Sequence, residues 1–146
     1  MRKRIRLIFP ECDVEVEAAL FEDKAPVSCK ALWRFLERPM ETTLHNCWPE
    51  LPELWFFIPE IRDLPFENPV MFTTPGDLLL YHYVRPNGRK VFDIGIYYTR
   101  GYSLIEVGWL PGNGIGRIDR NLEGLKKVVA RAMSKGDQEL IVKRAE

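Results

Sequence analysis

The chain has no long apolar run and few cysteines. Nowhere in its 146 residues do about 18 uncharged apolar residues occur together, and the basic N-terminus leads into no apolar run of signal-peptide length, so neither membrane insertion nor export is predicted. The three cysteines, Cys12, Cys29 and Cys47, are odd in number and widely spaced, which argues against a secreted disulfide framework. We expect reduced cysteines and a cytoplasmic protein.

An excess of charge of either sign is also missing. Lysine and arginine together number 21, and aspartate and glutamate together number 21, so no global field attracts nucleic acid, an anionic membrane or an acidic substrate. The one basic cluster, within residues 2–6, alternates with Ile5, Leu7 and Phe9 and is typical of an edge strand with a wet face. No nucleic-acid partner and no membrane partner are expected.

Motifs of common catalytic sites are missing as well. The chain has no Gly-x-Ser-x-Gly motif and no Walker lysine and serine, and the glycines of 108–116 lack the spacing of a dinucleotide fingerprint. Its two histidines, His45 and His82, form none of the close paired spacings of a structural zinc site. We therefore expect no metal and no cofactor, and we interpret 108–116 as a loop that makes a tight turn with close backbone approach.

What the chain does contain is a globular composition and many short apolar segments. Apolar residues make up 46% and charged residues 29%, as is usual for one folded domain of this length. In 14–20, alternate residues are apolar while Glu15 and Glu17 lie on the other face, which is the pattern of a half-buried strand. Such patterns and short apolar runs predict eight strands, at 4–9, 14–20, 42–47, 54–58, 77–84, 90–98, 102–106 and 141–142.

Two helices are predicted between these strands. The first begins at Pro26, where a first helical turn tolerates proline, and ends before Pro39. The second has apolar residues at helical spacing over 122–135, with Asp119 or Asn121 available as its cap. One helix therefore follows the first hairpin and the other precedes the last strand.

Two segments in this order resemble cyclophilins. Residues 16–35, with Leu20 to Pro26 at their centre, resemble the strand, turn and first helix of that family. Residues 109–129, from Trp109 through Pro111-Gly112, are similar to the segment that runs from the cleft tryptophan into the second helix. The resemblance implies a mainly β fold, a closed eight-stranded cyclophilin-like barrel capped by two α-helices, with residues 1–146 as a single domain.

The middle of the chain is more similar to a prokaryotic branch of cyclophilin-like proteins without a settled function. In that branch a histidine and tryptophans precede an Asn-Pro turn and a Pro-Gly-Asp turn. The matching residues here are His45, Trp48, Trp55, Asn68, Pro75, Gly76, Asp77 and the loop from Pro111 to Gly114.

The resemblance also argues against prolyl isomerisation. Cyclophilins depend on an arginine that follows a Phe-His pair, and the matching stretch here is Leu44-His45-Asn46. A neutral amide cannot supply the electrostatic stabilisation that a guanidinium gives to a twisted amide. We therefore expect no prolyl isomerase activity.

A small set of residues makes up the predicted site. His45 is the candidate catalytic acid or base, because histidine carries protons near neutral pH. The candidate ligand-binding residues are Trp48, Trp55, Trp109 and Asn113, and any ligand is expected to contact at least two of His45 and the three tryptophans.

Other side chains near His45 carry weaker predictions. Glu50, between Pro49 and Pro52, and Glu53, directly after Pro52, are expected to face solvent, while Cys47 can share a face with His45 as a thiol nucleophile.

Three functions fit these residues. The first is a cleft that binds a small organic molecule or short peptide. The second is an enzyme acting on a small amide or carboxylate, with His45 as acid or base. The third is a structural subunit of a homo-oligomer that buries its exposed aromatic residues.

Overall fold

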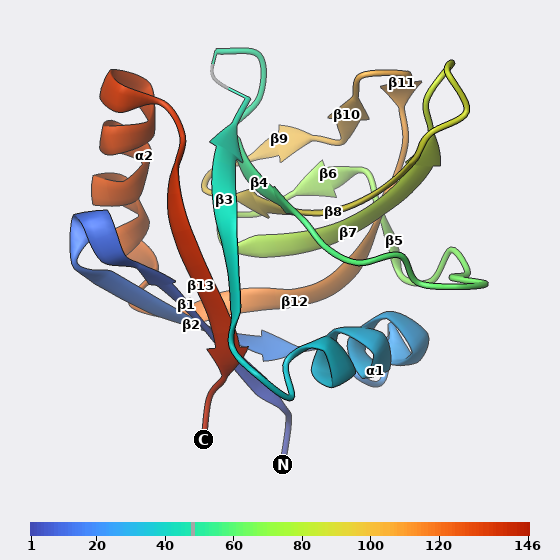
Figure 1. Cartoon of the computed structure of the whole chain (residues 1–146), viewed down its shortest axis with the longest axis horizontal. Helices are drawn as coiled ribbons and strands as arrows, with labels where there is room; N and C mark the ends of the chain where they lie inside the picture. Colours follow the sequence, from blue (N-terminus) through green and yellow to red (C-terminus); the bar gives the residue numbers. More distant parts are fainter. Residues whose placement is uncertain (48) are drawn as a thin grey trace.

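Eight strands close into an antiparallel barrel in the computed structural model, which describes residues 1–47 and 49–146 (Figure 1). Around the barrel they follow the order β2-β1-β13-β3-β4-β8-β7-β12, and pairing of β12 with β2 closes the circle. The expected barrel is therefore confirmed. The strands are β1 (Arg4–Phe9), β2 (Val14–Leu20), β3 (Met40–Asn46), β4 (Glu53–Phe57), β7 (Asp77–Val84), β8 (Lys90–Tyr97), β12 (Gly112–Arg120) and β13 (Gln138–Arg144).

The barrel interior is filled by alternate side chains of these strands. In β1, for example, Ile5, Leu7 and Phe9 are buried in the core. Arg6 lies on the opposite face, where it forms an ion pair with Glu17 of β2 at 2.9 Å. The period-two pattern seen in the sequence is thus the pattern of burial. The chain ends lie side by side because β1 pairs with β13 (Figure 1).

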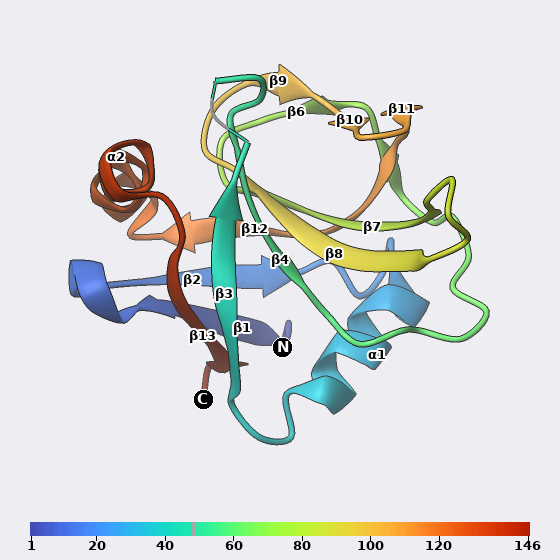
Figure 2. The same ribbon diagram turned by 45° about the horizontal axis from the view of Figure 1, so that its top comes forward.

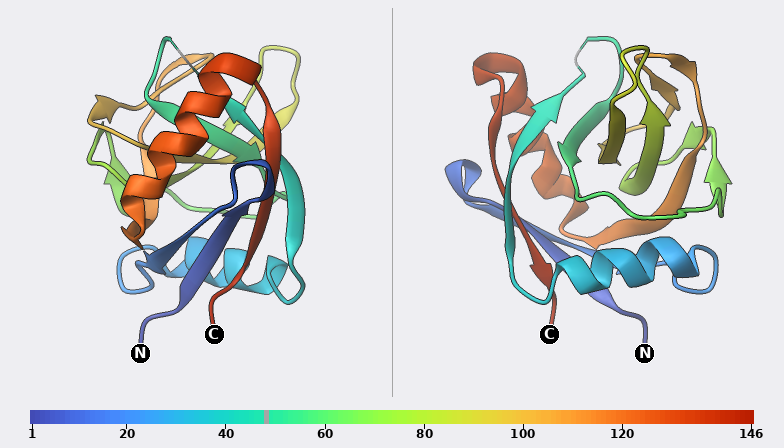
Figure 3. Two further views of the ribbon diagram at one scale, coloured as in Figure 1. Left: turned by 90° about the vertical axis from the view of Figure 1, so that its left-hand side faces the viewer. Right: turned by 45° about the vertical axis from the view of Figure 1, so that its right-hand side comes forward.

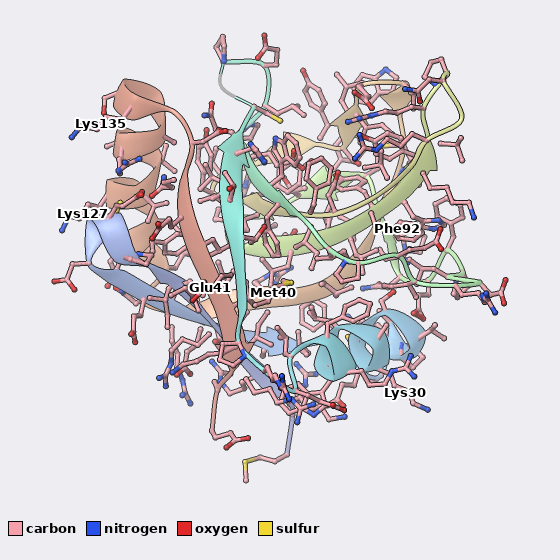
Figure 4. The ribbon with its side chains drawn as sticks, viewed as in Figure 1. Lys30, Met40, Glu41, Phe92, Lys127 and Lys135 are labelled. Atoms are coloured by element: carbon pink, nitrogen blue, oxygen red, sulfur yellow. The ribbon has the colours of Figure 1, made fainter. Side chains whose placement is uncertain are left out.

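Two helices complete the core from different sides of the barrel, as Figure 3 shows. They are α1 (Pro26–Phe35) and α2 (Leu125–Lys135). Buried residues of both helices belong to the same apolar cluster as the barrel interior. On the solvent side of α2, Lys127 and Lys135 point away from the barrel (Figure 4). Neither helix is long and apolar enough to cross a bilayer, which holds for every helix in the described residues.

The first turn of α1 is satisfied by a carboxylate from a distant loop. Glu67 accepts hydrogen bonds from the backbone N–H of Ser28 at 2.7 Å and of Val27 at 3.3 Å, and from the Ser28 hydroxyl at 3.0 Å. A carboxylate suits this position because it pairs with free N–H groups at the positive end of the helix dipole. The 58–68 segment is thereby fixed against α1.

Neither predicted cap residue forms a side-chain capping bond at the start of the second helical segment, although Asn121 is the residue directly before it. Asp119 is the last-but-one residue of β12 and forms an ion pair with Arg4. Asn121 has a left-handed backbone, with φ of 58°, and its amide donates to the carbonyl of Glu15 at 2.8 Å. A short 3-10 helix, η2 (Leu122–Gly124), then leads into α2. The side chain of Asp119 therefore contacts β1, and the side chain of Asn121 contacts β2.

The glycine-rich segment is a strand rather than a loop. Residues 112–116 form the first half of β12, and this strand, not 102–106, is the eighth of the barrel. A Cβ at Gly116 would lie 2.5 Å from the carbonyl oxygen of Ala19 in β2. The glycine is needed because two backbones approach closely where the barrel closes. The predicted close backbone approach is therefore confirmed, and the predicted tight turn is wrong.

Short strands outside the barrel replace the strand expected at 102–106. Tyr102 and Leu104 belong to different pairings, one with β6 and the other with β11. In the view of Figure 2 these short strands lie above β7 and β8. The additional elements are η1 (Pro10–Cys12), β5 (Pro69–Val70), β6 (Phe72–Thr73), β9 (Gly101–Tyr102), β10 (Leu104–Ile105) and β11 (Gly108–Trp109).

Candidate functional site

A second layer covers part of the barrel's outer surface. On the outer faces of β7 and β8, Leu79, Tyr81 and Tyr97 are buried and form a cluster separate from the barrel core. Ile105 of β10 packs against this cluster. Figure 2 shows β9, β10 and β11 above β7 and β8. Both faces of these strands are therefore enclosed at this point.

A pocket of about 430 Å³ opens beside this second layer. That volume lies within the usual range for small-molecule sites, roughly 300 to 1,000 Å³. Its walls combine outward-facing side chains of β4, β7 and β8 with residues of β10 and of the segment after β3. The lining residues are Asn46, Cys47, Glu50, Leu51, Glu53, Trp55, Tyr81, Tyr83, Arg85, Asp93, Leu104, Ile105 and Glu106.

Glu53 is a buried carboxyl group in this pocket. Only 7% of the residue is exposed, and its Oε1 accepts a hydrogen bond from the Cys47 thiol at 3.3 Å. Burial raises the pKa of Glu53 to about 7, although hydrogen bonding by Tyr97 and Cys47 lowers it. On β8, where Gly95 pairs with Trp55, a Cβ at Gly95 would overlap the Glu53 carboxylate. A glycine in the middle of β8 thus provides the space that the Glu53 side chain occupies.

Asp93 is the second buried carboxyl group. It is 7% exposed, and no hydrogen bond to its carboxylate is found among the described residues. Burial raises the pKa of Asp93 to about 8, with further contributions from the charges of Glu53 and Glu106, whereas Arg85 lowers it. The charge of Glu53 is thus one of the causes that raise the pKa of Asp93.

Tyrosine hydroxyls tie the covering segment to the barrel beneath it. Tyr81 and Tyr97 share a hydrogen bond of 2.7 Å between their hydroxyls, and Tyr81 shares another of 2.8 Å with the hydroxyl of Ser103. Ser103 also donates to the carbonyl of Leu110. The floor of the pocket is thus held rigid, which favours a preformed site.

Cys47 has no features of a nucleophile. Burial raises the pKa of its thiol, and the nearby Glu53 carboxylate raises it further. A thiolate is the reactive form of cysteine, so this environment keeps the group inert. The thiol acts as a donor to Glu53, and His45 has a different partner.

The structure brings together two of the predicted site residues. His45 and Trp55 face each other across β3 and β4, with ring centroids 4.4 Å apart. Nδ1 of His45 lies 2.9 Å from Oδ2 of Asp137. Trp55 lines the pocket, whereas His45 is not one of its described lining residues. Trp48 lies outside the described residues.

The other two predicted ligand-binding residues lie elsewhere. Trp109 is 62% exposed, and its ring contacts that of Tyr102, with the ring centroids 4.8 Å apart. Asn113 is buried, and its amide accepts from Glu67 N–H at 3.0 Å and donates to the Ser28 hydroxyl at 3.2 Å and the Pro65 carbonyl at 2.9 Å. These bonds satisfy the Asn113 side chain inside the protein, next to the start of α1.

Neither carboxyl group was predicted from the sequence to be part of the site. The prediction that Glu50 and Glu53 face solvent holds for Glu50 and is wrong for Glu53. A signal was present in β7 and β8, because consecutive apolar residues such as those of 78–81 indicate a strand buried on both faces. An aspartate within such a strand, as in Val91-Phe92-Asp93-Ile94, indicates a buried carboxyl group with a specific role.

Comparison with solved structures shows that the chain has a cyclophilin-like fold. The structure of McbB in complex with tryptophan is similar over 96% of this chain, with a TM-score of 0.70 and 13% identity. This chain spans only 44% of McbB. The Mimivirus cyclophilin is similar over 99% of this chain and 89% of its own, with a TM-score of 0.59 and 14% identity.

The family follows from sequence. The chain belongs to the family described as "Protein of unknown function (DUF3830)", which matches residues 7–142. No curated protein sequence matches that of the chain. At these sequence identities the solved structures establish a shared fold, and a shared fold does not imply a shared ligand or activity.

Proposed function

We propose that this protein binds a small organic molecule in the outer pocket, with Glu53 and Asp93 as its polar contacts. The observation that carries this proposal is the presence of two buried carboxyl groups in one pocket whose other walls include Trp55, Tyr81 and Tyr83. Burying a carboxyl group that forms no ion pair lowers stability, and carboxyl groups in such environments are typical of functional sites.

Two further points support this proposal. The lining combines aromatic walls with a few polar groups, which is the usual make-up of small-molecule sites. In addition, McbB, which has a similar fold, is known in complex with tryptophan, a small aromatic molecule. The proposal includes no prolyl isomerisation, because Asn46 at the pocket edge cannot replace an arginine.

An NMR titration with small aromatic fragments tests the proposal. We expect at least one fragment to shift resonances of Glu53, Trp55 and Asp93, and Trp55→Ala to weaken its binding at least tenfold, since an aromatic wall is lost. Phe72→Ala removes an aromatic residue that does not line the pocket and serves as the matched control. The proposal would be contradicted if fragments shifted only resonances of residues away from the pocket. It would also be contradicted if they bound the Trp55→Ala protein as tightly as the wild-type protein.

A second candidate function is self-association through an exposed aromatic patch. Phe72, Tyr102 and Trp109 are 78%, 41% and 62% exposed, Phe72 pairs with Tyr102 across β6 and β9, and the rings of Tyr102 and Trp109 are in contact. Contiguous apolar patches of this kind often lie at interfaces. We expect a concentration-dependent dimer in analytical ultracentrifugation that Trp109→Lys abolishes, and a monomer at high concentration would exclude this function.

A further inference from the structure

The charge of the outer pocket differs from that of the whole chain. The chain carries equal numbers of acidic and basic side chains. Among the described lining residues, however, Arg85 is the single cation. The acidic lining residues are Glu50, Glu53, Asp93 and Glu106. The pocket thus concentrates acidic side chains within a protein that has equal numbers of acidic and basic residues.

The one cation is already engaged. Nε of Arg85 lies 2.5 Å from Oε1 of Glu106, at the rim formed by β10 and the end of β7. This ion pair leaves Glu53 and Asp93 without a cationic partner of their own among the described residues. The hydrogen-bond donors to Glu53 are neutral, the Cys47 thiol and the Tyr97 hydroxyl. The charged groups that act on Asp93 are Glu53, Glu106 and Arg85.

Asp93 is the lining residue that most clearly lacks an ion-pair partner among the described residues. The residue is 7% exposed and lines the pocket, and no hydrogen bond to its carboxylate is found among the described residues. A carboxylate in such a position is stabilised strongly by a positive charge with hydrogen-bond donors. The neighbouring rings of Trp55 and Tyr83 add a favourable surface for a cation and for an apolar body attached to it.

We infer, on the basis of the proposed function, that the ligand carries an ammonium group that binds between Glu53 and Asp93 while its apolar part lies against the aromatic wall. The ligand class is therefore a primary or secondary amine with an aromatic or aliphatic body. The Arg85–Glu106 ion pair at the rim disfavours a second cationic site there, because both charges are already paired.

Proton release accompanies binding of such a ligand. In the free protein, burial keeps protons on Glu53 and Asp93 up to neutral pH, and the charges of Glu106 and Arg85 act on Asp93 in opposite directions. A bound ammonium favours the ionised carboxylates and so displaces these protons. Affinity for the amine is therefore expected to increase as the pH rises from about 6 to about 8, until both carboxyl groups are ionised without ligand.

Three probes with the same phenyl body test the inference by calorimetry. Phenethylamine is cationic, phenethyl alcohol is neutral and hydrocinnamate is anionic. We expect phenethylamine to bind at least tenfold more tightly than the alcohol, and hydrocinnamate more weakly than either. Glu53→Gln and Asp93→Asn should each lower affinity for phenethylamine much more than affinity for the alcohol and so remove most of the preference for the amine, whereas a general loss of folding would lower both affinities alike.

The outcomes separate the two proposals. Equal or tighter binding of the alcohol or of hydrocinnamate would overturn the ammonium site and leave small-molecule binding intact. Absence of binding by all three probes, with no fragment bound in the pocket either, would overturn both. An amine affinity that falls as the pH rises from about 6 to about 8 would also contradict the inference.

Discussion

Replacing Asp93 by asparagine is expected to raise the free energy of unfolding by about 3 kcal/mol at about pH 9 and to change it little at about pH 4. The pKa of Asp93 is raised from 3.8 to about 8 in the folded protein. The folded state therefore holds a proton that the unfolded chain has lost, and stability falls as the pH rises through this window. Asparagine keeps the shape of the neutral acid and cannot ionise.

The size of the effect follows from the pKa. A tenfold change in proton affinity corresponds to about 1.4 kcal/mol, so ionising Asp93 in the folded protein costs several kcal/mol of stability. Water that enters the pocket screens the charge and reduces this cost to about 3 kcal/mol. Urea unfolding at several pH values measures the effect. Glu41→Gln, which neutralises an exposed carboxyl group on β3, is the matched control. A pH dependence of Asp93→Asn as steep as that of the wild-type protein would contradict the burial of this charge.

Replacing Gly116 by valine is expected to lower the free energy of unfolding by about 3 kcal/mol or more. The Cβ of any residue at this position would lie 2.5 Å from the carbonyl oxygen of Ala19, and the obstacle is backbone rather than a movable side chain. Gly116 pairs with Leu20 where β12 and β2 close the barrel. Relieving the overlap requires these two strands to separate, which breaks the closing hydrogen bonds.

Arg120→Val tests whether valine in β12 is itself harmful. Arg120 lies on the same strand, is exposed, and loses only its surface ion pair with Glu17, so a change below about 1 kcal/mol is expected. Chemical unfolding of both variants provides the comparison. A Gly116→Val protein as stable as the Arg120→Val protein would show that the two backbones do not need to approach closely at Gly116.

The strands with clear alternation could be predicted from the sequence, whereas the strand that closes the barrel could not. In β1 and β2 the side-chain pattern alone indicates the buried face. In β12 the pattern is hidden by Gly112, Gly114 and Gly116, which normally indicate a turn. These glycines are required by neighbours from distant parts of the chain, such as Ala19, and a local pattern carries no information about them.

The site could be predicted only in part for a related reason. His45 and Trp55 were expected near one another and lie in contact across neighbouring strands. Whether Glu53 and Asp93 face water depends on the segment containing β9, β10 and β11, which covers the outside of the barrel. The path of that segment is set by tertiary contacts such as the bond between Ser103 and Tyr81, and alternation within one strand cannot reveal them.

The pocket and the barrel core use opposite faces of the same strands. In β4, Leu54 and Phe56 fill the interior, while Glu53 and Trp55 line the pocket outside. Selection for a new ligand can therefore exchange the outward side chains without repacking the interior that gives the protein its stability. The recognition chemistry of such a barrel can diverge faster than its architecture, and differences in ligand among its relatives are expected to be concentrated at every second residue of β4, β7 and β8.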